Sequence, residues 1–329
     1  MATLATNVFS LADWQKGRDP NGALAMTVEV LRQKNKILDD IMFKEGNLTT
    51  GHQVTVRTGY PAVTWVLLNA QTPATKSRKA QITETAGNAE TWLEIAKKIA
   101  DMGGNPTALL GDEAVAHIEA VSQEVASTYF YGNQTLAPEE FTGLSARYAS
   151  QSAEIGQNII DGGGTGSDNA SIWVIDWGPG IHGIYPKGMP MGLDFQNYGE
   201  ETKETTAGLS RVYRAQFQWH CGLAVPDWRA AVRLANIDVS NLVAKTSAAD
   251  IAEMLSMALE RLPNDNPGPN ARIYMNRTVR QMFRIQRRND VQTGGQLGYN
   301  VVDGRKILDF DGIPVHVCDA LSVTEETVS

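Results

Sequence analysis

The chain has 329 residues, of which 42% are hydrophobic, and its formal net charge at pH 7 is -8. This length and composition supply one large domain or two linked ones, with a core that needs neither metal nor disulfide support. The negative charge argues against a protein whose main task is to grip nucleic acid, because phosphate binding depends on clustered Lys and Arg. Any contact with DNA would have to be confined to a small part of the protein surface.

The location of the protein is indicated by its first residues and by its cysteines. Residues 1–20 lack the basic start and the continuous apolar stretch of a signal peptide, and no later run is long enough to span a bilayer. The two cysteines, Cys221 and Cys318, are too few for a disulfide scaffold and fit a reducing compartment. We therefore expect a protein that is made in the cytoplasm and contacts no membrane.

The first element we expect is a polar arm that leads into a helix. Asp19 is a suitable N-cap and Pro20 a suitable first helical residue. The apolar side chains that follow at roughly helical spacing are Leu24, Val28, Leu31 and Leu38. The apolar stripe on this N-terminal helix requires another surface to cover it.

The next element is a predicted hairpin. Residues 54–68 alternate apolar and polar side chains about a break at Gly59, Tyr60 and Pro61, and a polar run with three cations follows: Lys76, Arg78 and Lys79. We interpret 54–84 as a two-stranded excursion too thin to hold a core, which must lie on another surface because isolated hairpins are marginal in water. Trp65 is placed mid-strand, and we expect it to be buried at a subunit contact. The three cations Lys76, Arg78 and Lys79 are further candidates for a subunit contact.

The middle of the chain combines one long helix with several strands. Apolar residues recur every three or four positions over 112–129, which predicts a helix that ends at Gly132. Strand-like segments follow at 171–177, 180–186 and 211–225. A second helix is expected to begin at Ser247, with Asp250 three residues on, and to stop at Pro263.

The last part of the chain predicts a strand at 271–275, a helix at 276–288, and a strand pair within 306–317. Five arginines fall on one side of that helix: Arg277, Arg280, Arg284, Arg287 and Arg288. One interpretation is a solvated face partly paired with acidic neighbours. The other is a contact with an acidic surface of a second subunit or with DNA phosphate, and of these two we favour the subunit contact.

Catalytic chemistry has little support in this sequence. The loop Gly162–Ser167 is rich in glycine, yet no Lys-Ser/Thr pair completes a phosphate-binding motif, and the residues that follow predict a strand rather than a helix start. The five histidines are scattered singly, at positions 52, 117, 182, 220 and 316. We therefore expect no catalytic, cofactor-binding or metal-binding residues, and no enzyme.

Three stretches give the sequence a family resemblance. Residues 130–144 resemble the end of the spine helix in tailed-bacteriophage major capsid proteins of the Hong Kong 97 type, and 271–285 with 306–321 resemble a late strand, helix and strand unit of the same family. The most specific match is 158–178 with 218–238, which is similar to a branch that includes capsid proteins of the Bordetella phage group. The order of elements along the whole chain agrees with this family.

The resemblance implies an α+β fold of the Hong Kong 97 type, with an N-terminal arm, an extended hairpin called the E-loop, a long spine helix, and peripheral and axial domains. The implied approximate boundaries are 1–46 for the arm, 47–92 for the E-loop, 93–145 with 222–245 for the peripheral domain, and 146–221 with 246–329 for the axial domain. The family's cross-linking lysine and asparagine cannot be placed on this sequence.

The resemblance also implies a function. The expected protein assembles with itself into hexamers and pentamers of an icosahedral head, which encloses double-stranded DNA without sequence-specific binding. Its implied partners are a scaffolding protein and a portal, and a decoration protein is left open; its location is the virion, after assembly in the host cytoplasm. The alternatives are an encapsulin-type nanocompartment shell and a nucleotide-binding enzyme, which only the glycine-rich loop supports.

Overall fold

The computed structural model describes Phe9 and residues 31–102, 104–205, 208–264, 268–292, 299–302 and 305–329. The predicted early helix with Asp19 as its cap lies mostly outside these residues, and its described end is helical only over α2 (Ile37–Asp40). Within the described ranges, no helix is both long and apolar enough to cross a membrane.

Strands and helices occur in short runs along the described chain. After α2 come β1 (Phe43–Glu45), β2 (Gly51–Gly59), β3 (Arg78–Ala96), α3 (Lys97–Met102), α4 (Pro106–Tyr131), α5 (Leu144–Arg147), η1 (Glu154–Asn158), β4 (Ile159–Asp161), β5 (Asn169–Asp176) and β6 (His182–Tyr185). The second half holds β7 (Leu193–Thr205), β8 (Gly208–Ala224), η2 (Trp228–Ala230), β9 (Ala231–Asp238), α6 (Val239–Ala244), α7 (Ile251–Arg261), β10 (Ala271–Met275), α8 (Arg277–Gln292), β11 (Tyr299–Val302), β12 (Arg305–Phe310) and β13 (Ile313–Val317). The strands form two sheets.

The first sheet is elongated and has the strand order β1-β6-β8-β3-β2, with β7 paired to β8. Its centre is the antiparallel pair β3 and β8, in register from Ala86 opposite Gly222 to Ala96 opposite Val212. Leu93 and Ile95 alternate with Trp92 and Glu94 along β3, so one face of the sheet is apolar and is buried. The register therefore fixes which side chains meet a helix and which face outward.

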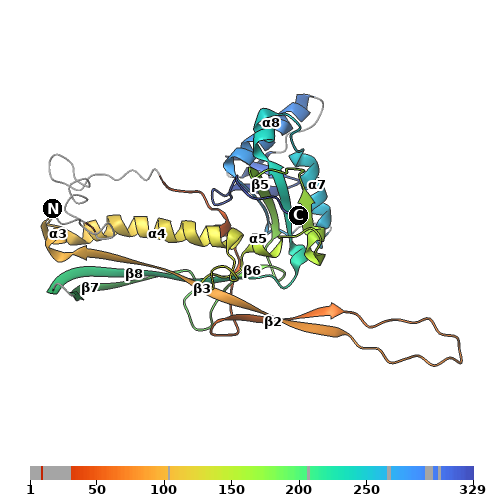
Figure 1. The fold of residues 1–329 in the computed structure, drawn as a ribbon, viewed down its shortest axis with the longest axis horizontal. Helices are drawn as coiled ribbons and strands as arrows, with labels where there is room; N and C mark the ends of the chain where they lie inside the picture. The colour runs from red at the N-terminus through yellow and green to blue at the C-terminus, as the bar shows by residue number, and fades with distance from the viewer. Residues whose placement is uncertain are drawn as a thin grey trace.

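The helix that covers this apolar face is α4. It begins at Pro106, six residues before the predicted start, because Asn105 caps it by accepting the Ala108 N–H at 3.1 Å. It ends where predicted, at Gly132, whose N–H donates to the Thr128 carbonyl at 2.9 Å. Figure 1 shows α4 running along one side of β3 and β8, and no other helix of the described residues lies on the opposite side of the sheet.

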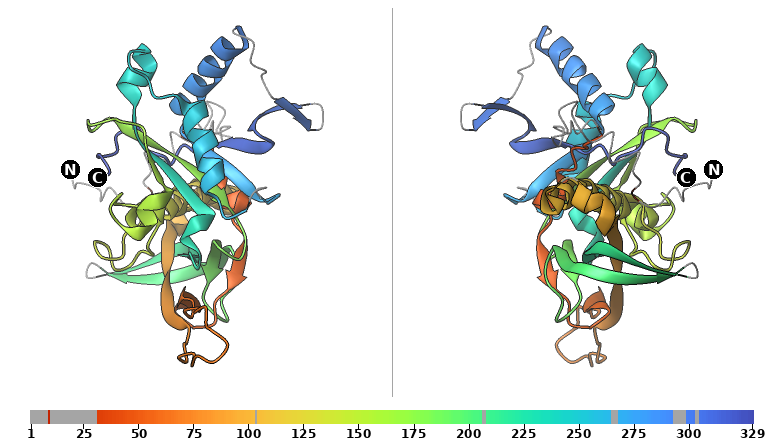
Figure 2. Two further views of the ribbon diagram at one scale, coloured as in Figure 1. Left: turned by 90° about the vertical axis from the view of Figure 1, so that its right-hand side faces the viewer. Right: turned by 90° about the vertical axis from the view of Figure 1, so that its left-hand side faces the viewer.

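The second sheet carries the rest of the chain, in the order β11-β12-β13-β10-β5-β9-β4. Helices α7 and α8 pack on it around a second buried apolar cluster, and Figure 2 shows them on the opposite side of the molecule from the hairpin. The predicted start of α7 at Ser247 is wrong: Asp250 is the cap and accepts the N–H groups of Ala252 and Glu253. Ser247 has a positive φ of 52°.

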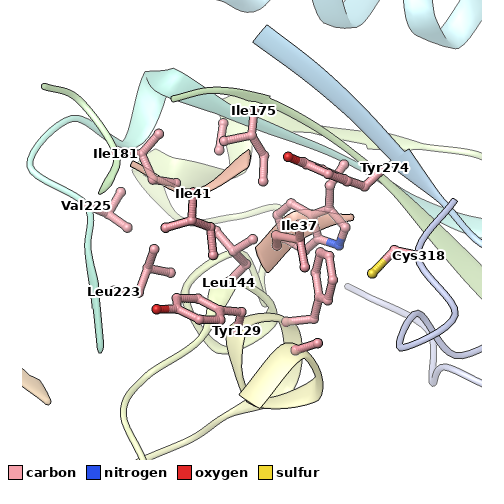
Figure 3. Packing of buried hydrophobic residues seen from close by; sticks show 14 of the residues in the cluster. Ile37, Ile41, Tyr129, Leu144, Ile175, Ile181, Leu223, Val225, Tyr274 and Cys318 are labelled. Atoms are coloured by element: carbon pink, nitrogen blue, oxygen red, sulfur yellow. The ribbon is translucent and has the colours of Figure 1, made fainter. Parts of the chain in front are cut away.

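The two sheets meet in a third region of dense packing, shown in Figure 3. Ile37 and Ile41 enter it from the root of the arm, Tyr129 from the end of α4, and Ile175 and Tyr274 from the second sheet. These side chains are almost fully buried. Because several segments contribute to one cluster, this junction positions the two sheets relative to each other.

The predicted hairpin exists, but its strands lie elsewhere than expected. β2 and β3 pair antiparallel from Gly51 opposite Thr85 to Gly59 opposite Arg78, and residues 60–77 between them form no strand. The prediction that Trp65 lies mid-strand is therefore wrong. Figure 1 shows the hairpin extending far beyond both packed regions, so its end has no layer to pair with. We call residues 60–77 the hairpin tip.

Candidate subunit-contact surfaces

The hairpin tip presents large apolar side chains to solvent. The exposed fraction of Trp65 is 99%, and its apolar neighbours in the tip are exposed to a similar degree: Tyr60, Val63, Leu67 and Leu68. The predicted contact cations Lys76, Arg78 and Lys79 are exposed at the same end of the hairpin. The hairpin tip and the adjoining start of β3 therefore combine an uncovered apolar surface with three cations, which is typical of a binding surface rather than of a core.

The root of the same hairpin is held by a buried ion pair. Arg147 donates two hydrogen bonds to the Glu84 carboxylate, at 2.7 and 2.6 Å, and three more to the carbonyls of Thr142 and Leu223. Such a bidentate pair fixes both partners in position. Glu84 lies on β3 and Arg147 on α5, so the pair fastens the hairpin to the end of the spine region.

Two buried histidines lie at this root. The rings of His52 on β2 and His182 on β6 meet edge to face, with their centroids 5.8 Å apart. Burial and the positive charge of Lys44 lower the pKa of both imidazoles. Both ring nitrogens of His182 are buried without a hydrogen-bond partner among the described residues, which makes a proton there costly.

The arginine helix α8 divides its cations between two surroundings. Arg277, Arg280 and Arg284 line a surface groove of about 320 Å³ together with Gln281 and Ile285. Arg277 pairs with Asp319 of the same chain at 2.7 Å. The structure thus brings three of the five predicted residues to one surface, where one of the three already has an acidic partner.

Arg287 turns away from that surface. Its guanidinium lies 5.6 Å from the ring centroid of Phe283 and 5.4 Å from that of Phe310, and it donates to the Asp309 carbonyl at 2.6 Å. Arg287 is therefore part of the packing between α8 and the second sheet. Arg288 belongs to α8, and its side chain lies outside the described residues.

Among the described residues, Arg280 lacks a hydrogen-bond partner for one of its side-chain nitrogens. Its Nε is buried and finds no hydrogen-bond partner in the described chain. Burial and the nearby charge of Arg284 lower the pKa of the Arg280 guanidinium. A carboxylate or phosphate placed in the groove would compensate the positive charges of Arg280 and Arg284.

A further exposed surface escaped the sequence analysis. Trp92 on β3 and Tyr198 on β7 stack on the sheet face that α4 leaves free, with ring centroids 5.6 Å apart. In the sequence, Trp92 stands two residues from Glu90 and Glu94, so all three lie on one face of the strand, and this face is polar. Its pairing with Tyr198, 106 positions later, required the register of three strands.

The glycine-rich loop is built into the fold. The N–H groups of Gly162, Gly163 and Gly164 donate to the Ala235 carbonyl, the Asp161 carboxylate and the Asn236 carbonyl at 2.8 to 2.9 Å. β5 follows the loop as a strand, which confirms that prediction. These N–H groups are therefore already bonded, and none of the three is free to hold a phosphate. Among the described residues, no cluster of three or more His, Cys, Asp or Glu could hold a metal ion.

The arrangement as a whole defines a class of protein. A long helix on an elongated sheet, a packed second sheet, and a projecting hairpin with an uncovered apolar tip are the architecture of a shell-forming subunit of the Hong Kong 97 type, as predicted. The family described as major capsid protein GP7 matches residues 19–329. The chain belongs to this family, and it is a major capsid protein of a tailed bacteriophage.

The comparison with solved structures found the following similarities. A chain in the structure of bacteriophage Epsilon15 is 29% identical in sequence, with a TM-score of 0.77, and the match covers 100% of this chain and 99% of that one. The capsid of bacteriophage JBD30 matches at 11% identity and a TM-score of 0.49, covering 92% and 99%. An encapsulin from Synechococcus elongatus matches more distantly, at 12% identity and a TM-score of 0.44, covering 71% and 97%. No curated protein matches the sequence.

Proposed function

We propose that this chain assembles into hexamers and pentamers of an icosahedral head, which encloses the double-stranded DNA genome of a tailed phage. The observation that carries the proposal is the hairpin tip, where Trp65 and its apolar neighbours have no cover within the subunit. Leaving one such side chain in water forgoes about 1.5 to 3 kcal/mol of burial, so the tip favours association with another subunit. A closed shell covers the same surface on every copy.

The partners follow from this function. A scaffolding protein would template the shell, a portal would occupy one vertex, and a decoration protein would be an addition to the finished shell. The chain would work in the host cytoplasm during assembly and remain in the virion afterwards. We also propose that it belongs to the Bordetella-phage-like branch, which residues 158–178 and 218–238 support.

The division into domains is also a proposal: the arm at 1–46, the E-loop at 47–92, the peripheral domain at 93–145 with 222–245, and the axial domain at 146–221 with 246–329. The E-loop boundary is supported by the strands β2 and β3 that form the hairpin. This division places β7 and most of β8 in the axial domain, although both strands belong to the same sheet as β3, so the boundary at 221 runs through that sheet.

The groove on α8 has a specific place in this proposal. We assign Arg277, Arg280 and Arg284 to a contact with carboxylates of a neighbouring subunit, and Arg287 and Arg288 to its margin. The unpartnered Nε of Arg280 supports this assignment. DNA contact ranks second, because each phosphate held by a fixed cation adds a salt-sensitive attraction that hinders packaging and release. The net charge of -8 agrees with enclosure without adhesion.

The proposal is tested by assembling the purified chain with scaffold and examining the products by sedimentation and electron microscopy. Closed particles that contain DNA after packaging are expected. Particles that carry a protein cargo and no DNA would favour the encapsulin-type alternative. A compact monomer whose residues 47–92 are protected from hydrogen exchange would overturn the proposal, because the hairpin would then be covered within its own subunit.

A further inference from the structure

Residues 318–329 follow β13 and cross the junction between the two sheets, although they form only isolated bridges to Asn35 and Asn169. Three of their side chains are buried members of the apolar cluster that joins the sheets: Cys318, Leu321 and Val328. Figure 3 shows Cys318 at the edge of this cluster, on the side of Ile37 and Tyr274. We call residues 318–329 the strap. Because the strap has no regular structure, individual contacts must hold its backbone in place.

One carboxylate anchors the strap to the second sheet. Glu325 accepts a hydrogen bond from Arg233 of β9 at 2.8 Å, and the exposed fractions of the Arg233 and Glu325 side chains are 5% and 7%. Arg233 also donates to the Ser171 hydroxyl at 3.0 Å and to the Tyr148 carbonyl at 2.8 Å, and it lies 5.4 Å from the ring centroid of Trp173. A buried cation that loses its partner is strongly destabilising. The strap therefore carries the charge that compensates Arg233.

The same carboxylate ties the strap to the long helix. Tyr131, the last residue of α4, donates its hydroxyl hydrogen to Glu325 at 2.6 Å and accepts the N–H of Ser322 at 2.8 Å. The Glu325 N–H donates to the carbonyl of Asn169 on β5 at 2.8 Å. α4 covers the first sheet, whereas β5 belongs to the second. The strap is thus hydrogen-bonded to both packed regions at one point.

The first residues of the strap form a further connection between the same regions. The Asp319 carboxylate accepts the Lys34 N–H at 2.9 Å, and the Asp319 N–H donates to the Lys34 carbonyl at 3.1 Å. Gln33, the preceding residue of the arm root, donates its N–H to Glu119 of α4 at 2.9 Å. Arg277 at the start of α8 donates to the same Asp319 carboxylate at 2.7 Å. The strap therefore joins the arm root, α4 and the second sheet.

We propose that the strap is a lock that sets the angle between α4 and the second sheet, with Tyr131 and Glu325 as the contact that closes it. Apolar contacts in the junction are non-directional, whereas the hydrogen bonds of the strap require aligned atoms. The inference rests on the proposed assembly, because rings of five and of six copies of one chain need this angle to be controlled. Neither residue has to touch a neighbouring subunit, so both are positioning residues.

Two hydroxyl deletions on α4 test the lock in the isolated subunit. Tyr131→Phe removes the bond between α4 and Glu325 and leaves the pair of Arg233 and Glu325 in place. Tyr129→Phe is the matched control, because the Tyr129 hydroxyl donates to the Gly222 carbonyl of the first sheet at 3.2 Å. Both variants lose one hydrogen bond at the end of the same helix, and only Tyr131→Phe alters the strap.

Hydrogen exchange reports whether the strap has loosened. The N–H groups of Glu325 and Val328 are suitable reporters, since each donates at 2.8 Å to an acceptor on the second sheet that both variants leave unchanged. We expect these two amides to exchange roughly five- to tenfold faster in Tyr131→Phe than in Tyr129→Phe. Glu325→Ala removes the anchor itself and should accelerate exchange at Val328 further.

Distances between spin labels measure the angle itself. The labels are attached to cysteines introduced at Ala116 of α4 and Ser256 of α7, two exposed helical positions, while the native cysteines are buried. Pulsed electron paramagnetic resonance should give a narrow distance distribution in the parent chain and in Tyr129→Phe. The distribution should be wider in Tyr131→Phe and widest in Glu325→Ala.

Two results would overturn the lock. One is an unchanged distance distribution in Tyr131→Phe although the strap amides exchange faster, because the strap would then not control the angle. The other is unchanged exchange at Val328 in both Tyr131→Phe and Glu325→Ala, because the strap would then be held by other contacts. If Glu325→Ala does not fold, Tyr131→Phe and its control still decide between these outcomes, since the buried ion pair is intact in both.

Assembly links the lock to the proposed function. We expect shells of more than one diameter from Tyr131→Phe subunits in electron micrographs, and one diameter from the parent chain and from Tyr129→Phe. Shells of one diameter from subunits with a widened distance distribution would show that the angle does not control assembly. If the parent chain forms no shells, the proposed function fails, whereas the exchange and label measurements still test the lock because they use the isolated subunit.

Discussion

The root and the tip of the β2–β3 hairpin differ in which kinds of side chain they bury and expose. At the root, Glu84 is paired with Arg147 in a buried, bidentate contact, and His52 and His182 are enclosed beside it. At the tip, Trp65 is 99% exposed although it is among the most hydrophobic side chains of the chain. Charged residues are thus buried where hydrophobic ones would be expected, and hydrophobic residues are exposed where charges would be expected.

This contrast shows that burial within the subunit and importance for function are separate properties. The root is fixed because its polar groups are satisfied inside the chain, so its contribution is to the stability of the subunit. The tip has no partner elsewhere in the described part of the chain, so its apolar side chains contribute only when another molecule covers them. Substitutions at the two ends should therefore affect different measurements.

The largest effect is expected at the root. Glu84→Gln removes the charge that compensates Arg147 and should lower the free energy of unfolding by about 3 to 5 kcal/mol, as for other broken buried pairs. Urea unfolding of the isolated subunit measures this loss. The exposed pair of Lys36 and Asp39 is the control, and Asp39→Asn should cost less than about 1 kcal/mol. Equal losses of unfolding free energy in Glu84→Gln and Asp39→Asn would contradict the claim that the ion pair fixes the root.

The tip should give the opposite result. Trp65→Ala is expected to leave the free energy of unfolding within about 0.5 kcal/mol of the parent chain, since the side chain touches no core. Assembly should weaken by about 1 to 3 kcal/mol per contact, measured as the subunit concentration at which shells form. If the variant monomer unfolds instead, Trp65 belongs to a subunit core and the contrast between root and tip fails.

The arginines of α8 extend the comparison to a second element. Arg280→Glu with Arg284→Glu should weaken capsomer formation in a salt-dependent way, even in empty shells, because these side chains face the groove. Arg287→Ala should instead destabilise the subunit by about 1 to 3 kcal/mol, since its guanidinium packs on Phe283 and Phe310. Normal assembly of empty shells with altered DNA retention would place the groove on the genome side.

The smallest effect is a pH dependence at the root. The pKa values of His52 and His182 are lowered by burial, so the unfolded chain binds more protons than the folded one below about pH 6.5. Stability is therefore full above that value and is lost as the pH falls through the lowered folded-state pKa values. The melting temperature should fall between about pH 7.5 and about pH 5.5, and less steeply in His182→Gln. An unchanged slope would show that other groups carry the dependence.

Local patterns were enough to predict much of the fold. The long helix ended at Gly132 as expected, the strand at 271–275 was placed correctly, and the turn at Asp311 and Gly312 has the two positive φ values of a tight hairpin. Each of these features depends on residues close together in the sequence. The start of α7 was placed wrongly, because Ser247 and Asp250 both resemble caps and only the backbone selects Asp250.

The sequence by itself determined several helices and strands, among them the long helix that ends at Gly132 and the strand at 271–275, and it showed that the hairpin has too little apolar surface for its own core. It could not show that Arg287 packs inward while Arg280 and Arg284 line a groove, because helical spacing places all three on one side. It also could not bring Trp92 and Tyr198 together, since their contact depends on the register of β3, β8 and β7. Periodicity acts over a few residues, whereas partners and surfaces depend on how distant strands align.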